Sequence, residues 1–294
     1  MNNIEPIISE IELVTGIDMS QHQLSPVSGG SINTAYRVQT AQHSYFIKLN
    51  QPKRASMFEA EVKGLTEMRG LDFVRIPGVV CNGQTEHHSY LVLEYIEISS
   101  LHDSAAKLLG TQLAQLHRHT QPFFGWYTDN TIGSTPQYNN REHDWATFWK
   151  KYRLGPQLEF ASQNGFNGNL QSQGALLLEQ LHHFFDGYTP SPSLLHGDLW
   201  SGNAAADSHG NPVIFDPACY YGDRESDIAM TELFGGFDLD FYNAYQAEYP
   251  LDSAYKTRKT LYNLYHILNH LNLFAGSYLG QAENMINQLL AEIK

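Results

Sequence analysis

Apolar and polar residues along the chain follow two spacings, one typical of strands and one typical of helices. Short, mostly apolar runs at Ser44–Leu49 and Ser89–Ile96 predict strands. Apolar residues recur at helical spacing over residues 4–16 and 56–68, and again through most of the chain beyond residue 100. The pattern therefore predicts strands and helices that are unevenly distributed along the chain.

The composition changes after Ile96, where strand-like segments give way to helix-like ones. A long amphipathic helix is expected from about Leu101, and the tail Tyr255–Ile293 is also expected to be helical. We predict an α+β fold with two lobes, a small sheet-rich lobe over residues 1–97 and a larger helical lobe over residues 98–294. A cleft between unlike lobes is a usual place for a ligand.

The stretch Leu194–Ala229 gathers a histidine, an amide and several carboxylates around a predicted hairpin. Two short apolar runs, residues 204–207 and 212–215, are separated by the turn-forming residues Ser208-His209-Gly210-Asn211. We expect these four residues to close the hairpin.

A symmetrical four-residue loop would place Asp207 opposite Pro212 and Asn203 opposite Asp216. Directly opposed residues in an antiparallel pair have Cβ atoms about 4.5–5.5 Å apart. An amide oxygen and a carboxylate would then converge, and hard cations such as Mg²⁺ prefer oxygen ligands of this kind together with phosphate. Asn203 and Asp216 are therefore candidate metal ligands.

Asp198 precedes Asn203 with four residues between them. This spacing is that of the kinase catalytic loop, in which the Asp accepts the proton of the substrate hydroxyl and the Asn holds a metal ion. Asp198 is the candidate catalytic residue. We expect His196 and Asp227 to support the loop, although Asp227 and its neighbour Ser226 would also suit a helix cap.

Lys48 lies in a predicted strand and shares a face with Phe46. A lysine in apolar surroundings needs a partner, because an unpaired buried ammonium group is costly. Glu61 lies on the apolar stripe of the next predicted helix, whereas Glu59 does not. The sequence favours a Lys48–Glu61 pair that positions nucleotide phosphates, over a solvated surface pair.

Two further segments are candidates for nucleotide binding. The turn Ser28-Gly29-Gly30-Ser31 would let backbone N–H groups approach phosphate oxygens, although such a turn is often only a hairpin connection. Glu94-Tyr95-Ile96 ends a strand at the predicted lobe boundary, where its backbone would either meet an adenine edge or serve as a connector.

Residues 123–157 are rich in aromatic and polar side chains. Trp145, Phe148 and Trp149 have helical spacing, which indicates core packing more often than a ligand platform. Asp129 begins a polar loop suited to sugar contacts. We take Asp129 and Asp144 as candidate substrate residues.

Composition excludes several classes of protein. The net charge of −13 over 294 residues argues against a general nucleic-acid binder, but not against ATP, which needs only a few local donors and a metal ion. Cys81 and Cys219 are too few for a disulfide framework and are expected to be reduced thiols. The N-terminal residues form no signal-peptide pattern and no apolar run is long enough to span a membrane, so we expect a cytoplasmic protein.

These motifs resemble those of the fructosamine (ketosamine) kinase family, which shares the two-lobed fold of aminoglycoside phosphotransferases and protein kinases. The run Asp198-Leu199-Trp200-Ser201-Gly202-Asn203, with Trp after Leu, is distinctive of that family. The resemblance covers nearly the whole chain, and the remaining segments that carry it are Ser28–Ser31, Lys48, Phe58–Glu61, Ile132–Gln137, His196–Gly197 and Phe215–Ala218.

The resemblance implies ATP-dependent phosphorylation of a sugar hydroxyl, at O3 of a ketosamine, with Mg²⁺ as the metal ion. It implies that Trp200 forms a wall for the sugar, and that the partner is a small sugar-amine or a glycated protein. We expect a monomer that binds neither nucleic acid nor membrane. An aminoglycoside, choline or homoserine-type acceptor is the alternative substrate. A catalytically silent nucleotide-binding protein and a hydrolase using Asp198 and Asp216 are alternative functions.

Overall fold

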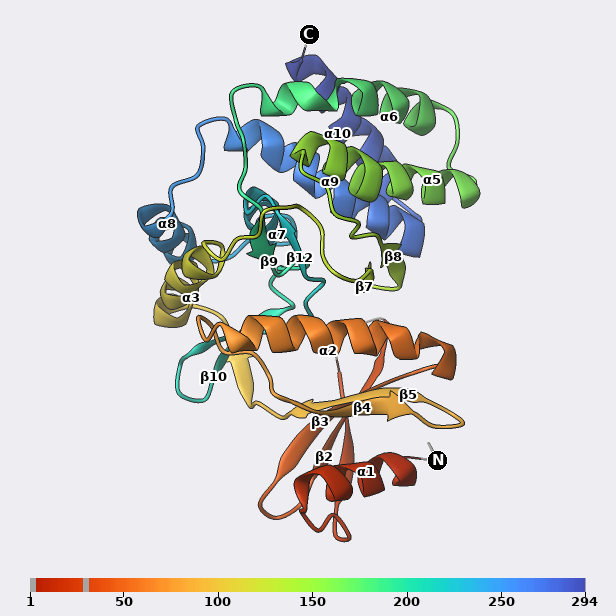
Figure 1. Ribbon diagram of the computed structural model, residues 1–294, viewed down its shortest axis with the longest axis vertical. Helices are drawn as coiled ribbons and strands as arrows, with labels where there is room; N and C mark the ends of the chain where they lie inside the picture. Colours follow the sequence, from red (N-terminus) through yellow and green to blue (C-terminus); the bar gives the residue numbers. More distant parts are fainter. Residues whose placement is uncertain (1–3, 29–31, 294) are drawn as a thin grey trace.

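The strand-like segments of the N-terminal third form a five-stranded antiparallel sheet (Figure 1). The computed structural model describes residues 4–28 and 32–293. The strand order is β1-β2-β3-β5-β4, and the strands are β1 (Gln23–Val27), β2 (Thr34–Gln39), β3 (Ser44–Asn50), β4 (Val79–Gln84) and β5 (Ser89–Glu94).

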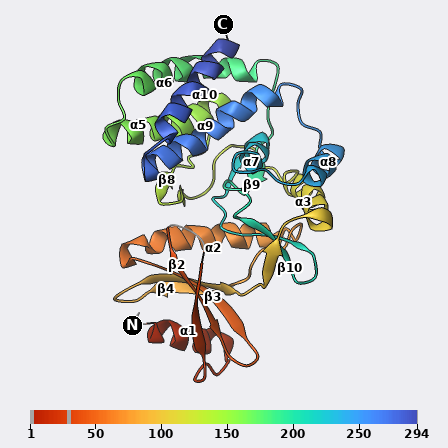
Figure 2. The same cartoon turned by 180° about the vertical axis from the view of Figure 1, so that it is seen from behind.

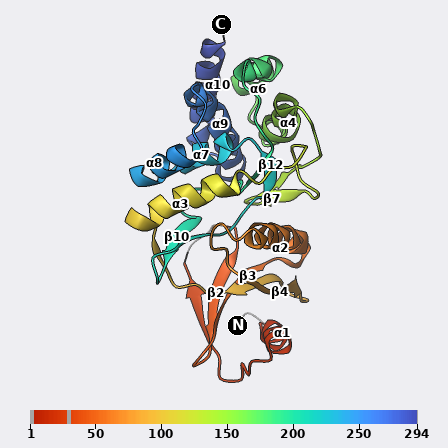
Figure 3. The ribbon, with the colours of Figure 1, turned by 60° about the vertical axis from the view of Figure 1, so that its left-hand side comes forward.

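Two helices lie on opposite faces of this sheet, as Figures 1 and 3 show. α1 (Glu5–Thr15) buries its isoleucines against the outer face, in a cluster that includes Ile47 and Leu49 of β3. α2 (Ala55–Gly70) covers the inner face, toward which Phe46 and Lys48 point. The predicted helices at both positions and the predicted division of the β3 side chains between two faces are confirmed.

The C-terminal part is mainly helical, as the sequence predicts, and Trp145, Phe148 and Trp149 are buried in its core. No helix in the described part of the chain is long and apolar enough to cross a membrane. The helices are α3 (Asp103–Leu116), α4 (Trp145–Trp149), α5 (Gly155–Gln163), α6 (Asn169–Gln180), α7 (Glu225–Thr231), α8 (Leu239–Glu248), α9 (Tyr255–Phe274) and α10 (Tyr278–Glu292).

Short strands support the functional residues in this part. β9 (Ser193–Leu195) pairs with β12 (Tyr220–Gly222), and β10 (Ala204–Asp207) pairs with β11 (Pro212–Ile214). β7 (Asn130–Ile132) and β8 (Thr135–Gln137) form a small hairpin above α2 (Figure 1).

The sheet and the helical part are joined where the chain crosses between them. β6 (Ile98–Ser100), directly after the crossing, pairs with β10, which lies beside the junction in the view from behind (Figure 2). Arg75 reaches Glu94 at 2.8 Å and Asp207 at 2.5 Å, so its guanidinium group links both parts. The lobe boundary between residues 97 and 98 stays a prediction.

Candidate active site

A cavity of about 710 Å³ lies between the sheet and the helical part. Its lining includes all five residues that the sequence assigns to phosphoryl transfer, which are Lys48, Glu61, Asp198, Asn203 and Asp216. Lys48 and Glu61 come from the sheet and α2, whereas the other three come from the stretch between β9 and β12. The structure therefore brings together residues that are far apart in the sequence.

Lys48 lies at the centre of this group and is only 4% exposed. Its Nζ donates to Glu61 Oε1 at 2.6 Å and to Asp216 Oδ1 at 2.5 Å. Burial alone would lower the pKa of Lys48, but attraction to Asp216 and then to Glu61 outweighs burial and raises it. The ammonium group therefore stays charged, and the Lys48–Glu61 pair predicted from periodicity is confirmed.

The backbone before Asp198 makes a sharp turn that only glycine suits. Gly197 has φ of +81°, and a Cβ added there would lie 2.1 Å from the carbonyl oxygen of Ala218. We refer to residues 196–203 as the catalytic loop. The close approach at Gly197 brings the start of this loop beside the segment that follows Asp216.

His196 fastens the same two segments through both of its ring nitrogens. Its Nε2 lies 3.0 Å from the carbonyl oxygen of Phe215, which can only accept, so Nε2 carries the proton. Nδ1 is then an acceptor, and it lies 3.3 Å from the backbone N–H of Asp198. Burial lowers the pKa of His196 and favours this neutral form. The expected supporting role of His196 agrees with these contacts.

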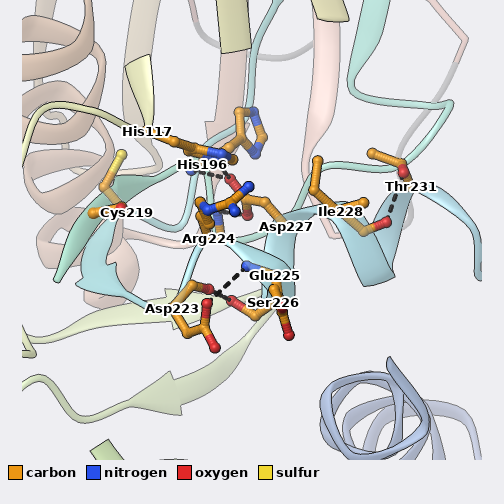
Figure 4. A network of polar contacts seen from close by, with 12 residues as sticks. His117, His196, Cys219, Asp223, Arg224, Glu225, Ser226, Asp227, Ile228 and Thr231 are labelled. Atoms are coloured by element: carbon orange, nitrogen blue, oxygen red, sulfur yellow. Dashed lines mark hydrogen bonds and ion pairs between the residues drawn. The ribbon is translucent and has the colours of Figure 1, made fainter. Parts of the chain in front are cut away.

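Asp227 supports the catalytic loop from below (Figure 4). Its carboxylate accepts from the backbone N–H of His196 at 2.7 Å, from that of Gly197 at 2.8 Å and from His117 Nε2 at 3.2 Å. Burial opposes its ionisation, but the hydrogen bonds, that from His117 first, hold the pKa of Asp227 below its usual value. Neither Asp227 nor Ser226 caps α7, whose N-cap position is Arg224, and the backbone N–H of Glu225 donates instead to Asp223 Oδ1 at 3.0 Å.

The predicted register of the β10–β11 hairpin is wrong by one residue. Ala206, not Asp207, is opposite Pro212, and the backbone N–H of Phe215 donates to the carbonyl oxygen of Asn203 at 3.1 Å. The Asp207 side chain accepts from the backbone N–H groups of residues 209 and 211, both at 2.9 Å, and so tightens the loop to three residues.

Asp216 follows the last paired position and has φ of +60°, a left-handed conformation that aspartate tolerates better than most residues. It still reaches the cavity beside Asn203. The Nδ2 group of Asn203 donates to the carbonyl oxygen of Asp198 at 2.8 Å and to Asp198 Oδ2 at 3.2 Å. Among the described residues this leaves Asn203 Oδ1 free, so the two side chains offer hard oxygen ligands that suit Mg²⁺.

Burial and the neighbouring Asp216 raise the pKa of Asp198 to about 7. A general base works best when its pKa lies near the working pH, so the Asp198 carboxyl group is suited to accept a proton close to pH 7. In the part of the chain that the structure describes, no three His, Cys, Asp or Glu side chains form a metal cluster by themselves.

Apolar side chains from the sheet and from the helical part also line the cavity, among them Val27, Phe46, Val213 and Phe215. Ser28 lines the cavity too, whereas the predicted positions Gly29, Gly30 and Ser31 lie outside the described residues. That Val213 and Phe215 line the cavity could not be predicted from the sequence, because their place there depends on how the hairpin packs under the sheet.

Glu94, Tyr95 and Ile96 also line the cavity. The Glu94 carboxylate binds Arg75 at 2.8 Å and the backbone N–H of Gly78 at 3.1 Å, so its side chain holds the junction. The backbone N–H groups of Tyr95 and Ile96 bond to no other described residue, which leaves them available to a flat polar ligand.

The remaining wall of the cavity comes from Trp200, α7 and the C-terminal helices. Trp200 meets Phe234 edge to face at 6.1 Å between ring centroids, and Phe234 lies 4.8 Å from the ring of His270. His266 is buried, and burial lowers its pKa to about 3, so its imidazole is neutral. The predicted sugar wall, Trp200, is therefore part of a longer aromatic surface.

The contribution of α9 to this wall was not predicted from the sequence. His266, Asn269, His270, Leu273 and Phe274 recur at helical spacing and line the cavity together. That spacing was visible in the sequence, but nothing in it indicated which face of α9 would meet the catalytic loop.

Two predicted substrate residues do not line the cavity. Asp129 accepts from the backbone N–H of Asn139 at 2.7 Å and so joins the two ends of the β7–β8 hairpin. Asp144 is the N-cap of α4 and accepts from the backbone N–H of Thr147 at 2.8 Å. Both carboxylates have structural partners outside the cavity, and we leave them out of the proposed substrate site.

Similarity to known proteins extends over nearly the whole chain. The fructosamine kinase family model matches residues 3–292. A Synechocystis protein named a probable ketoamine kinase is 44% identical over 97% of this chain and 96% of its own length. A chloroplastic protein-ribulosamine 3-kinase of Arabidopsis thaliana is 39% identical over 99% of this chain and 89% of its own length.

Solved structures give the same result for the fold. A Haemophilus somnus protein assigned as a fructosamine-3-kinase matches with a TM-score of 0.88 and 29% identity, covering 97% of this chain and 96% of that one. An aminoglycoside phosphotransferase matches with a TM-score of 0.63 and 15% identity, covering 97% of this chain and 98% of that one. The expected α+β, kinase-like fold is confirmed.

Proposed function

Because the chain belongs to the fructosamine kinase family, we propose that it transfers the γ-phosphoryl group of ATP to a sugar hydroxyl, O3 of a ketosamine such as a fructosamine or a ribulosamine. The observation that carries this proposal is the ion pairing of Lys48 with both Glu61 and Asp216 inside the cavity that Asp198 lines. This is the constellation that phosphoryl transfer requires.

In the proposed reaction the sugar hydroxyl oxygen forms a bond to the γ-phosphorus while the bond from that phosphorus to the bridging oxygen of ADP breaks. Asp198 orients the hydroxyl group and takes its proton, and its pKa near 7 suits a base at neutral pH. Lys48 neutralises the nucleotide phosphates, and Glu61 keeps its ammonium group in place.

Asn203 and Asp216 would hold the Mg²⁺ ion, which neutralises negative charge on the phosphates when bound. Asp216 offers one carboxylate oxygen to Lys48, which leaves the other for the metal ion. Ser28 and the backbone of Tyr95 and Ile96 are proposed to contact the nucleotide, and Gly29, Gly30 and Ser31, which lie outside the described residues, remain candidates for the same role. Trp200 is proposed to pack against the sugar.

The charges around the cavity favour a ketosamine over an aminoglycoside acceptor. The carboxylates among its described lining residues are Glu61, Glu94, Asp198 and Asp216. Glu61 and Asp216 bind Lys48, Glu94 binds Arg75, and Asp198 accepts from Asn203. The wall formed by Trp200, Phe234 and α9 is aromatic and adds none. An acceptor with several ammonium groups would find no further carboxylate there to pair with.

The test is a phosphate-transfer screen with ATP and Mg²⁺ against fructosamines, ribulosamines and erythrulosamines, beside aminoglycosides, choline and homoserine. We expect the ketosamines to be phosphorylated at O3, as shown by NMR of the product. Binding of ATP without transfer to any acceptor would favour a silent nucleotide-binding protein. Hydrolysis of glycosides without nucleotide would favour a hydrolase. A cytoplasmic monomer acting on free or protein-bound ketosamines remains a prediction.

A further inference from the structure

α2 carries Glu61 to Lys48, so its position decides whether the cation is held. Glu67 lies farther along the same helix, and both of its carboxylate oxygens are used. Trp126 Nε1 donates to Oε2 at 2.7 Å, and the Tyr221 hydroxyl donates to Oε1 at 2.6 Å. Trp126 and Tyr221 are only 3% and 2% exposed, so Glu67 is fixed to a rigid part of the molecule.

The partners of Glu67 belong to the framework that holds the catalytic loop. Tyr221 exchanges two backbone hydrogen bonds with Gly125, both of 2.8 Å, and Gly125 directly precedes Trp126. Tyr221 also lies in β12, opposite Leu194 of β9, the strand that leads into the catalytic loop. Glu67 therefore connects α2 to the strand pair from which Asp198 is presented.

A close contact supports the same arrangement beside Glu67. A Cβ added to Gly64 would lie 3.1 Å from Cys219 Sγ, so the absence of a side chain lets α2 approach that residue. Met68 Sδ lies 3.3 Å from the same sulfur. Cys219 follows Asp216 closely in the sequence, so α2 rests on the segment that carries a proposed metal ligand.

We propose that Glu67 is a positioning residue, which fastens α2 to the catalytic framework so that Glu61, Lys48 and Asp216 are assembled before nucleotide binds. The hydrogen bonds to Trp126 and Tyr221 hold the orientation of α2, and the Gly64–Cys219 contact lets α2 pack closely against the framework. Glu67 touches neither nucleotide nor acceptor in this scheme and acts through Glu61. The kinetic part of its test rests on the proposed function, whereas the labelling part below does not.

The first test compares Glu67→Ala with Glu67→Gln. Loss of both hydrogen bonds in Glu67→Ala should lower kcat/KM for ATP at least tenfold, with little change in KM for the acceptor. Glu67→Gln should recover most of the activity, because its amide oxygen accepts from Trp126 and its NH₂ group donates to the Tyr221 oxygen. Glu59→Ala, an exposed position on the same helix, is the matched control and should be unchanged.

A double variant separates positioning from general stability. If Glu67 acts through Glu61, adding Glu67→Ala to Glu61→Gln should cause no further loss in kcat/KM for ATP, less than about twofold. A second loss as large as that of the single Glu67→Ala variant would overturn the proposal, because Glu67 would then act independently of Glu61.

The second test needs no activity. Cys219 lies under α2 and is buried, so a thiol reagent should modify it only when α2 separates from the segment. In a Cys81→Ala background, which leaves Cys219 as the single thiol, Glu67→Ala should speed labelling at least tenfold at a urea concentration well below unfolding. Unchanged labelling would overturn the proposal even if activity falls.

Tyr221→Phe serves if Glu67→Ala does not fold, because it removes one hydrogen bond and keeps the ring. It should speed Cys219 labelling and lower ATP affinity, measured by calorimetry with Mg²⁺, and both effects should be smaller than those expected for Glu67→Ala. Failure of every acceptor in the screen would count against the proposed function, whereas unchanged labelling would count against the role of Glu67.

Discussion

Asp227 supports the catalytic loop through three hydrogen bonds, and the substitution Asp227→Asn tests this support. The carboxylate accepts from the backbone N–H groups of His196 and Gly197 and from His117, and it is 1% exposed. An asparagine at this position has one oxygen in place of two. Its NH₂ group must then face at least one buried donor.

The cost follows from these contacts. A buried donor left without an acceptor costs about 1–3 kcal/mol. The bonds that remain lose the extra strength of a charged acceptor, which adds roughly 1 kcal/mol. We therefore expect Asp227→Asn to lower the free energy of unfolding by about 2–4 kcal/mol, and to lower kcat further because the turn at Gly197 loses its fixed partner.

Urea unfolding followed by circular dichroism measures the first effect, and the steady-state rate at saturating ATP measures the second. Asp240→Asn in the first turn of α8 is the matched control, because Asp240 is exposed, and its unfolding free energy should stay within about 0.5 kcal/mol of the wild type. A loss in Asp227→Asn no larger than that of the control would refute the assigned role of Asp227.

Three further substitutions test other parts of the site. Asp216→Ala should abolish the Mg²⁺ dependence of ATP affinity measured by calorimetry, and an unchanged dependence would remove Asp216 from the metal site. Gly197→Ala should destabilise the fold by more than about 1 kcal/mol in urea, because φ is +81° and the new Cβ meets the Ala218 carbonyl oxygen; a neutral result would contradict the close approach. The pKa of His266 is about 3 in the folded protein, below its value of about 6.5 in the unfolded chain, so His266 binds a proton more readily when the chain is unfolded. With respect to this group, the free energy of unfolding is therefore highest above about pH 6.5 and decreases as the pH falls. Relative to His266→Gln, the unfolding free energy of the wild type should thus fall by up to about 1.4 kcal/mol per pH unit between pH 6 and 4, and parallel pH curves would show that His266 titrates normally.

Local patterns in the sequence were sufficient where a single element decides the outcome. The stripe of α2 selected Glu61 over Glu59 as the partner of Lys48, and the contact of 2.6 Å confirms that choice. The position of Asp216 was harder, because a side chain rather than the backbone sets the hairpin loop. Asp207 tightens that loop by one residue, whereas a symmetrical count of the four turn-forming residues places Asp207 in the paired strand.

Contacts between distant segments could not be predicted in the same way. His270 reaches the cavity because α9 packs behind the catalytic loop, and Glu67 meets Trp126 and Tyr221 because α2 lies across two separate segments. Asp129 shows the opposite case, since a residue whose polar loop suited sugar contacts instead joins the two ends of the β7–β8 hairpin. Each outcome depends on tertiary packing, which periodicity does not encode.

Arg75 has a consequence for how a nucleotide enters. Its guanidinium group is gripped by Glu94 on one side of the chain crossing and by Asp207 on the other, and β6 runs beside it. A straight separation of the sheet from the helical part would break one of these ion pairs, whereas a rotation about Arg75 would keep both. We therefore expect a hinge motion about Arg75, in which the far side of the cavity widens to admit ATP while the two parts stay in register at the junction.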